Sequence, residues 1–205
     1  HEVPGTGLTR MTRAVTAWLM TRTARTASAV VTVSASAADA ISRHLGVPRE
    51  RVTVVHNGGS EIAPVDHPWS VLAPLGIGPG RAIVLSTGNR MPHKNFAGLL
   101  AAVGQIPTAD RPLTVIAGGG ADDPLRQVVE RLGLMNDVVL PGWVSDDQLR
   151  ALYQVATVYA CPSLTEGFGL PVVDALAAGV PVVAHDTAVL REVGGVHARY
   201  ADATV

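Results

Sequence analysis

The chain has little cysteine, few aromatic residues and little charge, and each shortage narrows the class of protein. Its single cysteine, Cys161, excludes an internal disulfide and is typical of a buried thiol in a reducing compartment. A net charge of -1 at neutral pH argues against nucleic acid as the main partner. No apolar run is long enough to span a bilayer. The seven histidines show no spacing typical of metal ligands, so we expect no protein-bound metal.

Apolar residues, by contrast, are plentiful, and their order predicts the fold class. With 205 residues, 47% of them hydrophobic, the chain can bury one sizeable core or two modest ones. Short strand patterns alternate with helix patterns from Arg81 to Tyr200. Successive strands separated by helices need crossover connections. The sequence therefore predicts an α/β fold, with a parallel sheet flanked by helices.

The most informative stretch is 163–179, which has the pattern of a loop and helix between two strands. Glu166 lies in the loop, and Asp174 follows eight residues later, early in the helix. Gly167 and Gly169 let the backbone approach a ligand, and a helix start is a natural anion site. A carboxylate beside an anion site suits a ligand with phosphate at one end and hydroxyls at the other. A nucleotide sugar fits that description.

A second motif begins at the strand predicted over 82–86. Gly88, Arg90 and Lys94 follow it, in the loop and helix entry where open α/β sheets bind ligands. Two cations there can neutralise a diphosphate and the charge that a leaving group gathers. Solvated surface charges are the usual fate of Arg and Lys, and alone this motif would be read so. Together with the Glu166 loop it favours phosphate binding.

Glu166 and Asp174 resemble the paired-acid motif of the family 4 retaining glycosyltransferases, in which both acids are usually Glu. The likeness extends to the flanks, Pro-Ser-x-x-Glu-Gly-Phe-Gly-Leu-Pro before and Ala-x-Gly-Val-Pro-Val-Val after. It implies a GT-B architecture of two facing Rossmann-like domains, of which this chain holds the donor half. It also implies that the anomeric configuration of the transferred sugar is retained.

The resemblance further implies that the chain consists of three parts. Residues 1–58 would be the C-terminal portion of the acceptor-side domain, 59–79 an interdomain linker rich in Pro and Gly, and 80–205 a donor-binding domain truncated at its C-terminus. In the family, the Asn-Gly pair at Asn57 marks the crossing between domains. We expect the chain to be a fragment or processed piece, with a reduced natural protein as the alternative.

The roles of the site residues follow from the same resemblance. Arg90 and Lys94 would hold the donor diphosphate, and Glu166 would contact the donor sugar. Asp174 would accept hydrogen bonds from the ribose, although its side chain is one methylene shorter than the usual Glu. The predicted catalytic residues are Glu166, Arg90 and Lys94. The predicted donor site comprises Gly88, Arg90, Lys94, Trp143, Val144, Glu166, Gly167, Phe168, Gly169, Leu170 and Asp174, with His1 as a weaker candidate for a donor-sugar contact.

Other features have plainer explanations. Trp143 could stack on the nucleotide base, but a packed or surface tryptophan is at least as good a reading. The turn at 117–120 lacks the full dinucleotide spacing and is expected to be structural. The acidic pairs 122–123 and 146–147 resemble metal ligands, yet each stands at a predicted helix start, where Asp caps free N–H groups.

The N-terminal region predicts a basic amphipathic helix. It has no acidic residue between Val3 and Ala38, and four apolar residues share one helical face: Met11, Val15, Trp18 and Leu19. A transit-type leader is disfavoured because the pattern runs directly into a strand. Packing on the domain is the preferred interpretation. Peripheral contact of residues 10–25 with an anionic membrane is the second.

Taken together, the resemblance predicts a retaining glycosyltransferase. It would move a sugar from a nucleotide-diphosphate donor, GDP- or UDP-linked, to a saccharide, lipid-linked or small-molecule acceptor, without a further cofactor. We expect it in the cytoplasm, with the inner face of the membrane as a second location. A non-catalytic nucleotide-sugar-binding module is the alternative, and a sugar-nucleotide epimerase ranks third.

Overall fold

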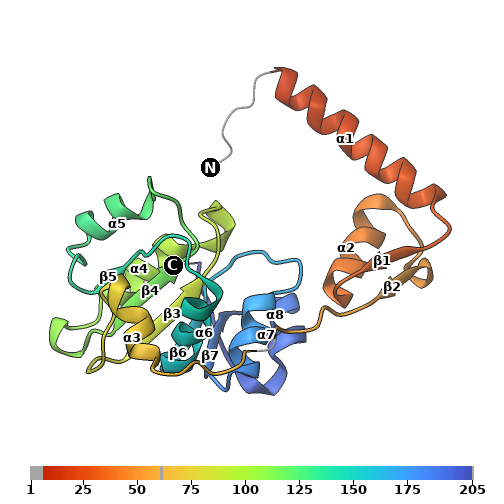
Figure 1. The fold of residues 1–205 in the computed structure, drawn as a ribbon. Helices are drawn as coiled ribbons and strands as arrows, with labels where there is room; N and C mark the ends of the chain where they lie inside the picture. The colour runs from red at the N-terminus through yellow and green to blue at the C-terminus, as the bar shows by residue number, and fades with distance from the viewer. Residues whose placement is uncertain (1–6, 61, 205) are drawn as a thin grey trace. The chain divides into compact units, whose positions relative to one another are not determined.

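The computed structural model describes residues 7–60 and 62–204, so the contact predicted for His1 lies outside the described residues. The chain divides into two compact units, residues 1–57 and 58–205 (Figure 1). The division falls between Asn57 and Gly58, inside the Asn-Gly pair of the predicted crossing. The domain boundaries drawn from the sequence stay predictions.

The first unit is a small helix-and-strand assembly. Its elements are α1 (Gly7–Thr26), β1 (Val30–Thr32), α2 (Ala35–Leu45), η1 (Arg49–Arg51) and β2 (Val52–Val54). The two strands pair in parallel, with Val30 opposite Val52. Helix α2 begins after Ser34, whose hydroxyl accepts the N–H of Ala37, and ends at Gly46 in the left-handed conformation.

The apolar face of α1 is not buried within the described residues. Val15, Trp18 and Leu19 are each at least half exposed. The C-terminal end of α1 is joined to the end of α2, where Arg25 Nε donates to the carbonyl of Leu45 at 2.8 Å. Packing on the domain, which is the preferred interpretation, and membrane contact both stay predictions.

The second unit contains a six-stranded, fully parallel sheet, which confirms the predicted α/β fold class. The strand order is β5-β4-β3-β6-β7-β8. The strands are β3 (Ile83–Thr87), β4 (Leu113–Ala117), β5 (Val138–Val139), β6 (Val158–Cys161), β7 (Val182–His185) and β8 (Ala198–Ala201). The helices are α3 (Pro68–Leu72), α4 (Phe96–Gly104), α5 (Leu125–Arg131), α6 (Asp146–Val155), α7 (Leu170–Ala177) and α8 (Ala188–Gly194), with short 3-10 turns η2 (Ala73–Leu75), η3 (Pro92–Lys94), η4 (Thr108–Asp110) and η5 (Gly195–His197).

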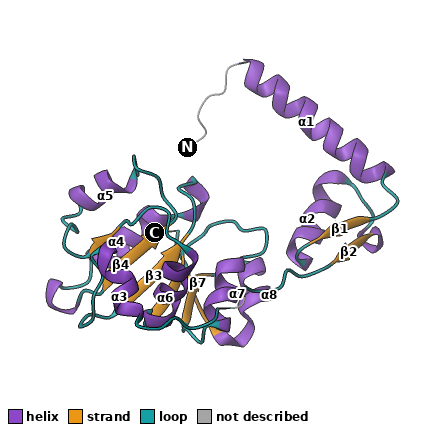
Figure 2. Ribbon diagram, viewed as in Figure 1, coloured by secondary structure: helices purple, strands orange, loops and turns teal. Residues whose placement is uncertain are grey.

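Helices cover both faces of this sheet (Figure 2). Side chains of α3, α6, α7 and α8 form one large core with alternate residues of the strands, including Leu85 and Val182. Helices α4 and α5 form a second core on the opposite face, with Ile116 and Val138. All five residues of β4 are buried, as expected for a central parallel strand. The sheet is thus a rigid platform for the loops at its edges.

Part of the predicted linker is folded. Residues 68–75 form α3 and η2, and Leu72 and Ile77 are fully buried in the large core. The Pro and Gly content of 59–79 concealed this helix, whose Pro68 stands at the first position, where a missing N–H is tolerated. The later half of the predicted linker therefore belongs to the second unit.

The two acidic pairs at helix starts differ in their roles. Asp123 accepts the N–H of Leu125, the first residue of α5, as predicted, and its carboxylate also accepts from Arg90. The pair 146–147 does not cap α6, which is capped by Ser145 in a capping box with Gln148. The sequence pattern located both helices but identified the group at the start of only one of them.

Candidate functional site

The order of the strands locates the candidate site. Strands β3 and β6 are neighbours, and the chain winds away from them in opposite directions, to β4 and β5 on one side and to β7 and β8 on the other. In open parallel sheets, ligands bind at this switch point, outside the carboxyl ends of the strands. The loops that follow β3 and β6 carry the two motifs singled out in the sequence.

Lys94 and Glu166 form an ion pair across this switch point. Lys94 Nζ lies 2.6 Å from Glu166 Oε1, and their side chains are 15% and 12% exposed. The loops are also joined by a backbone hydrogen bond, in which Leu164 N–H donates to the carbonyl of His93 at 2.8 Å. Two predicted site residues from motifs 72 residues apart are therefore brought together, as a cation and a carboxylate with little solvent around them.

Arg90 lies beside this pair but is bound inside the protein. Its Nε donates to both carboxylate oxygens of Asp123, and its Nη2 lies 2.7 Å from Asp123 Oδ2. Nη1 donates to the carbonyl of Gly88, and Nη2 also donates to that of Ile116. The side chains of Arg90 and Asp123 are only 9% and 2% exposed. The donors of Arg90 thus serve a carboxylate and two backbone carbonyls here, and its predicted role in holding a diphosphate stays a prediction.

The pKa of Asp123 fits a bracing role, in which this carboxylate holds the Arg90 side chain in place. Burial by itself raises the pKa of Asp123, but hydrogen bonds from Arg90 and the Leu125 N–H, together with the charges of Arg90 and Arg126, outweigh it. The pKa of Asp123 therefore lies below its ordinary value. Sequence reasoning assigned this residue a capping role only. The available signal was an acid in the turn after β4, on the same sheet edge as an arginine after β3.

Glycines allow the loops after β3, β4 and β5 to pack closely. Gly118 N–H donates to the carbonyl of Gly142 at 2.7 Å, and Gly88 N–H donates to that of Ala117 at 3.0 Å. Gly118 has a φ of 101°, and a Cβ added there would lie 2.7 Å from the carbonyl oxygen of Gly88. The turn at 117–120, which was predicted to be structural, thus packs against the side chain of Arg90.

The Glu166 loop leads into α7 through a compact turn. Gly169 precedes the helix with a φ of 99°, a conformation that favours glycine. Phe168 is buried and Leu170, the first helical residue, is 40% exposed. A helix start is a natural anion site, and the role of residues 167–170 in anion binding stays a prediction.

Asp174 lies on α7 and has an unexpected partner. Its Oδ1 accepts the backbone N–H of Ser60 at 2.7 Å. Ser60 is the third residue of the second unit and was not among the predicted site residues. A bond to the main chain leaves no mark in the sequence, so this contact could not be predicted.

Trp143 and Val144 have different surroundings. Trp143 is 83% exposed and borders a shallow hollow with Gly119, Gly120 and Arg126. Val144 is half-buried and packs against the large core. An exposed indole at the carboxyl edge of the sheet is available for stacking, but Val144 has chiefly a packing role.

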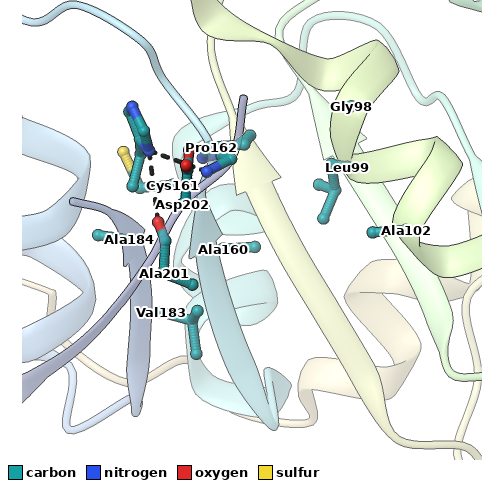
Figure 3. A pocket seen from close by; sticks show the side chains of 12 residues that line it. Gly98, Leu99, Ala102, Ala160, Cys161, Pro162, Val183, Ala184, Ala201 and Asp202 are labelled. Atoms are coloured by element: carbon teal, nitrogen blue, oxygen red, sulfur yellow. Dashed lines mark hydrogen bonds between the residues drawn. The ribbon is translucent and has the colours of Figure 1, made fainter. Parts of the chain in front are cut away.

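A separate apolar pocket lies between α4 and strands β6, β7 and β8 (Figure 3). Leu99, Ala160, Val183 and Ala201 contribute to its walls, with Cys161 at one end. Burial raises the pKa of the Cys161 thiol, so this cysteine is expected to be inert. None of the predicted donor-site residues within the described chain lines this pocket.

Within residues 7–60 and 62–204, no group of three or more His, Cys, Asp or Glu side chains is arranged to hold a metal ion. Independence from metal stays a prediction. None of the helices found in that part has the length and apolar character to cross a membrane.

Known proteins resemble the chain in both units. The model of the group 1 glycosyl transferases matches residues 71–197, and that of Glycosyltransferase Family 4 matches residues 4–59. An O-antigen chain mannosyltransferase B of Escherichia coli is 40% identical over 116 residues, covering 54% of this chain and 30% of that protein. An uncharacterized glycosyltransferase of Methanocaldococcus jannaschii is 31% identical over 173 residues, covering 80% of this chain and 44% of that protein.

A solved structure shows the same fold. The structure of Anabaena HepE in complex with UDP-glucose has a TM-score of 0.79 and 24% sequence identity, and the match covers 92% of this chain and 54% of that one. The chain therefore spans about half or less of the proteins that it matches here. The model of the group 1 glycosyl transferases alone covers more than half of the chain, so the chain belongs to that family.

Proposed function

We propose that this chain supplies the donor site of a retaining glycosyltransferase that uses a nucleotide-diphosphate sugar. The observation that carries the proposal is the Lys94–Glu166 pair at the topological switch point, beside the start of α7. A cation, a helix start and a carboxylate in one place suit a diphosphate joined to a sugar. The bound UDP-glucose of HepE and the mannosyl transfer named for the Escherichia coli relative support this class of donor.

The chemistry assigns Lys94 to the leaving group. In the transfer, the bond between the anomeric carbon and the diphosphate oxygen breaks and positive charge develops on the sugar. The diphosphate gathers negative charge as it leaves. Lys94, with backbone N–H groups near the start of α7, would stabilise that charge in a site with little water. Arg90 would act indirectly, by holding the loop after β3 in place.

Glu166 has a different task, which its partner makes testable. Without ligand, its carboxylate neutralises Lys94 at 2.6 Å. An arriving diphosphate competes with Glu166 for the same ammonium group, and repulsion between the two anions favours moving the carboxylate toward the sugar hydroxyls. Glu166 would thus exchange Lys94 for the sugar when the donor binds.

Lys94 is the only lysine in the sequence, which permits a direct binding test. We expect the side-chain NMR signals of isotope-labelled Lys94 to shift on titration with GDP or UDP, in parallel with calorimetric binding. Lys94→Ala should weaken binding about tenfold or more, since one charge-assisted hydrogen bond contributes roughly 1.5–3 kcal/mol. Arg131→Ala, at an exposed position in the last turn of α5, is the control. Unchanged affinity in Lys94→Ala would refute the site.

Glu166→Gln separates the two roles of that residue. Removing the competing charge should tighten binding of the nucleoside diphosphate by a few-fold, while transfer or donor hydrolysis should fall by at least tenfold. The measurements are calorimetry with GDP and UDP and release of nucleotide from the nucleotide sugar. A non-catalytic binding module predicts the same rise in affinity but no donor turnover in the unmodified chain.

A further inference from the structure

A hydrogen bond between Ser60 and Asp174 joins the beginning of the second unit to α7. The main-chain N–H of Ser60 donates to Asp174 Oδ1 at 2.7 Å, across 114 positions of the sequence. Both residues belong to the second unit, and Ser60 is its third residue. A short bond from an N–H to a carboxylate is among the stronger hydrogen bonds in proteins. The segment 58–60 is therefore held to the middle of α7.

Gly59 shows how closely this segment approaches the helix. A Cβ added at Gly59 would lie 2.7 Å from Val173 Cγ1 and 3.7 Å from Asp174 Oδ1. Its neighbour Gly58 has no such restriction, since an added Cβ there would meet nothing within 4 Å. The backbone of Gly59 thus packs directly against α7, which brings the N–H of Ser60 within reach of the carboxylate.

The length of the acidic side chain fits the same contact. A glutamate at position 174 would carry its carboxyl group one carbon–carbon bond, about 1.5 Å, farther along the side chain. At a bond length of 2.7 Å that extension leaves no room without a change of rotamer. An aspartate is therefore the acid that fits between α7 and a backbone held this close.

We propose that Asp174 is a positioning residue that couples nucleotide binding to the segment 58–60. It holds the Ser60 N–H through Oδ1 and presents its remaining acceptor capacity to the hydroxyls of a ribose. A carboxylate offers about four acceptor positions, so both partners can bind together. The ribose part of this inference rests on the proposed function, whereas the anchoring of the segment does not.

Coupling follows from linkage. When Ser60 already fixes the orientation of the carboxylate, a ribose that binds it has less side-chain freedom to remove. The nucleotide must then stabilise the Ser60 bond by the same factor by which the bond improves nucleotide affinity. A typical net hydrogen-bond contribution corresponds to roughly two- to tenfold.

The anchoring is tested without ligand, by residue-resolved hydrogen exchange at the Ser60 amide. Asp174→Ala should accelerate exchange of this amide severalfold or more, whereas Asp174→Asn retains a carbonyl acceptor and should stay near the unmodified rate. The amides of Val182–His185 report whether the variants are folded. Equal Ser60 exchange in the unmodified chain and in a folded Asp174→Ala variant would overturn the proposal.

The coupling is tested by affinity for GDP and UDP, with Asp174 left intact. Ser60→Pro removes the N–H and should weaken nucleotide binding two- to tenfold, while Ser60→Ala retains the N–H and should not. In the unmodified chain, the bound nucleotide should slow Ser60 exchange by a similar factor, which gives a readout that needs no variant. Equal affinity in the two variants, or unchanged exchange on saturation, overturns the coupling. If the unmodified chain binds neither nucleotide, both the coupling and the proposed function are overturned. The ligand-free exchange of the Ser60 amide still shows whether Asp174 anchors the segment 58–60.

Discussion

The charged residues at the switch point form two ion pairs that have different roles. The side chains of Lys94 and Glu166 are 15% and 12% exposed, whereas those of Arg90 and Asp123 are 9% and 2% exposed. The planar guanidinium suits the second place, because its fixed fork of donors matches a carboxylate and two strand-end carbonyls at once. A single ammonium on a flexible chain suits the first, where partners are exchanged.

Asp123→Asn should destabilise the second unit. The change keeps the shape of the side chain but leaves the Arg90 guanidinium buried without a counter-ion, and breaking a buried pair in this way costs about 3–5 kcal/mol. Urea unfolding at pH 7 measures the difference. Asp122→Asn, at the exposed neighbouring position, is the matched control and should change stability by no more than about 0.5 kcal/mol. Equal stability of the two variants would contradict the bracing role.

The same pair predicts a pH dependence with a definite sign. The folded pKa of Asp123 lies below its ordinary value of 3.8, so the unfolded chain binds its proton more readily. The stabilisation is therefore fully present above pH 3.8 and is lost as pH falls through the folded pKa. The stability gap between the unmodified chain and Asp123→Asn should narrow as the pH is lowered below that value.

At the scale of elements, three loops converge because glycines leave room for them. The loops after β3, β4 and β5 are joined by main-chain hydrogen bonds at Gly88 and Gly118. Predicted strands lie within a few residues of the observed ones, since runs of β-branched residues between turn residues are a local signal. The helix start predicted at 146–147 is confirmed by α6, which begins at Asp146, but its capping residue, Ser145, was not predicted, because capping depends on side-chain direction. Helix α5 begins at Leu125, three residues after Asp122.

Gly119 and Gly120 form a matched pair for testing this convergence. A Cβ at Gly119 would overlap Asp123 Oδ2 and lie 2.7 Å from Arg90 Nη2, whereas one at Gly120 would meet nothing within 4 Å. Gly119→Ala should therefore cost about 1–3 kcal/mol through overpacking. Gly120→Ala should be neutral or stabilising by less than about 1 kcal/mol. Thermal and urea unfolding of both variants test this, and equal effects would show that the turn can relax.

At the scale of the whole molecule, the two units differ greatly in core size. The buried core of the first unit consists of Ala38, Val47 and Val52, whereas the second has two clusters built on a six-stranded sheet. Each fully buried aliphatic side chain contributes roughly 1.5–3 kcal/mol. Within the described residues, Val31 of β1 is 64% exposed, although it belongs to a parallel strand.

We therefore expect the first unit to open more readily than the second. Backbone amides of Val30–Thr32 should exchange at least tenfold faster than those of Leu113–Ala117, which lie in a fully buried central strand. Residue-resolved hydrogen exchange on the complete chain measures both strands in one sample. Similar protection of β1 and β4 would show that the small core suffices, and would contradict this expectation.

The sequence by itself determined the fold class and the family. Both depend on local patterns: alternating strand and helix runs, and the motif around Glu166 with its flanks. It also placed Lys94 and Glu166 correctly at strand ends, because a residue after a parallel strand must lie at one edge of the sheet. The roles in donor binding and transfer stay predictions.

Only the tertiary structure decided which groups pair. Arg90 meets Asp123 across 33 positions, Lys94 meets Glu166 across 72, and Ser60 meets Asp174 across 114. Each pairing depends on which loops the strand order brings together and on how closely glycine backbones approach. Neither the strand order nor the close approach of the backbone can be read from a local sequence pattern. Any charged residue could form such a pair equally well until the fold determines which charged groups are removed from water.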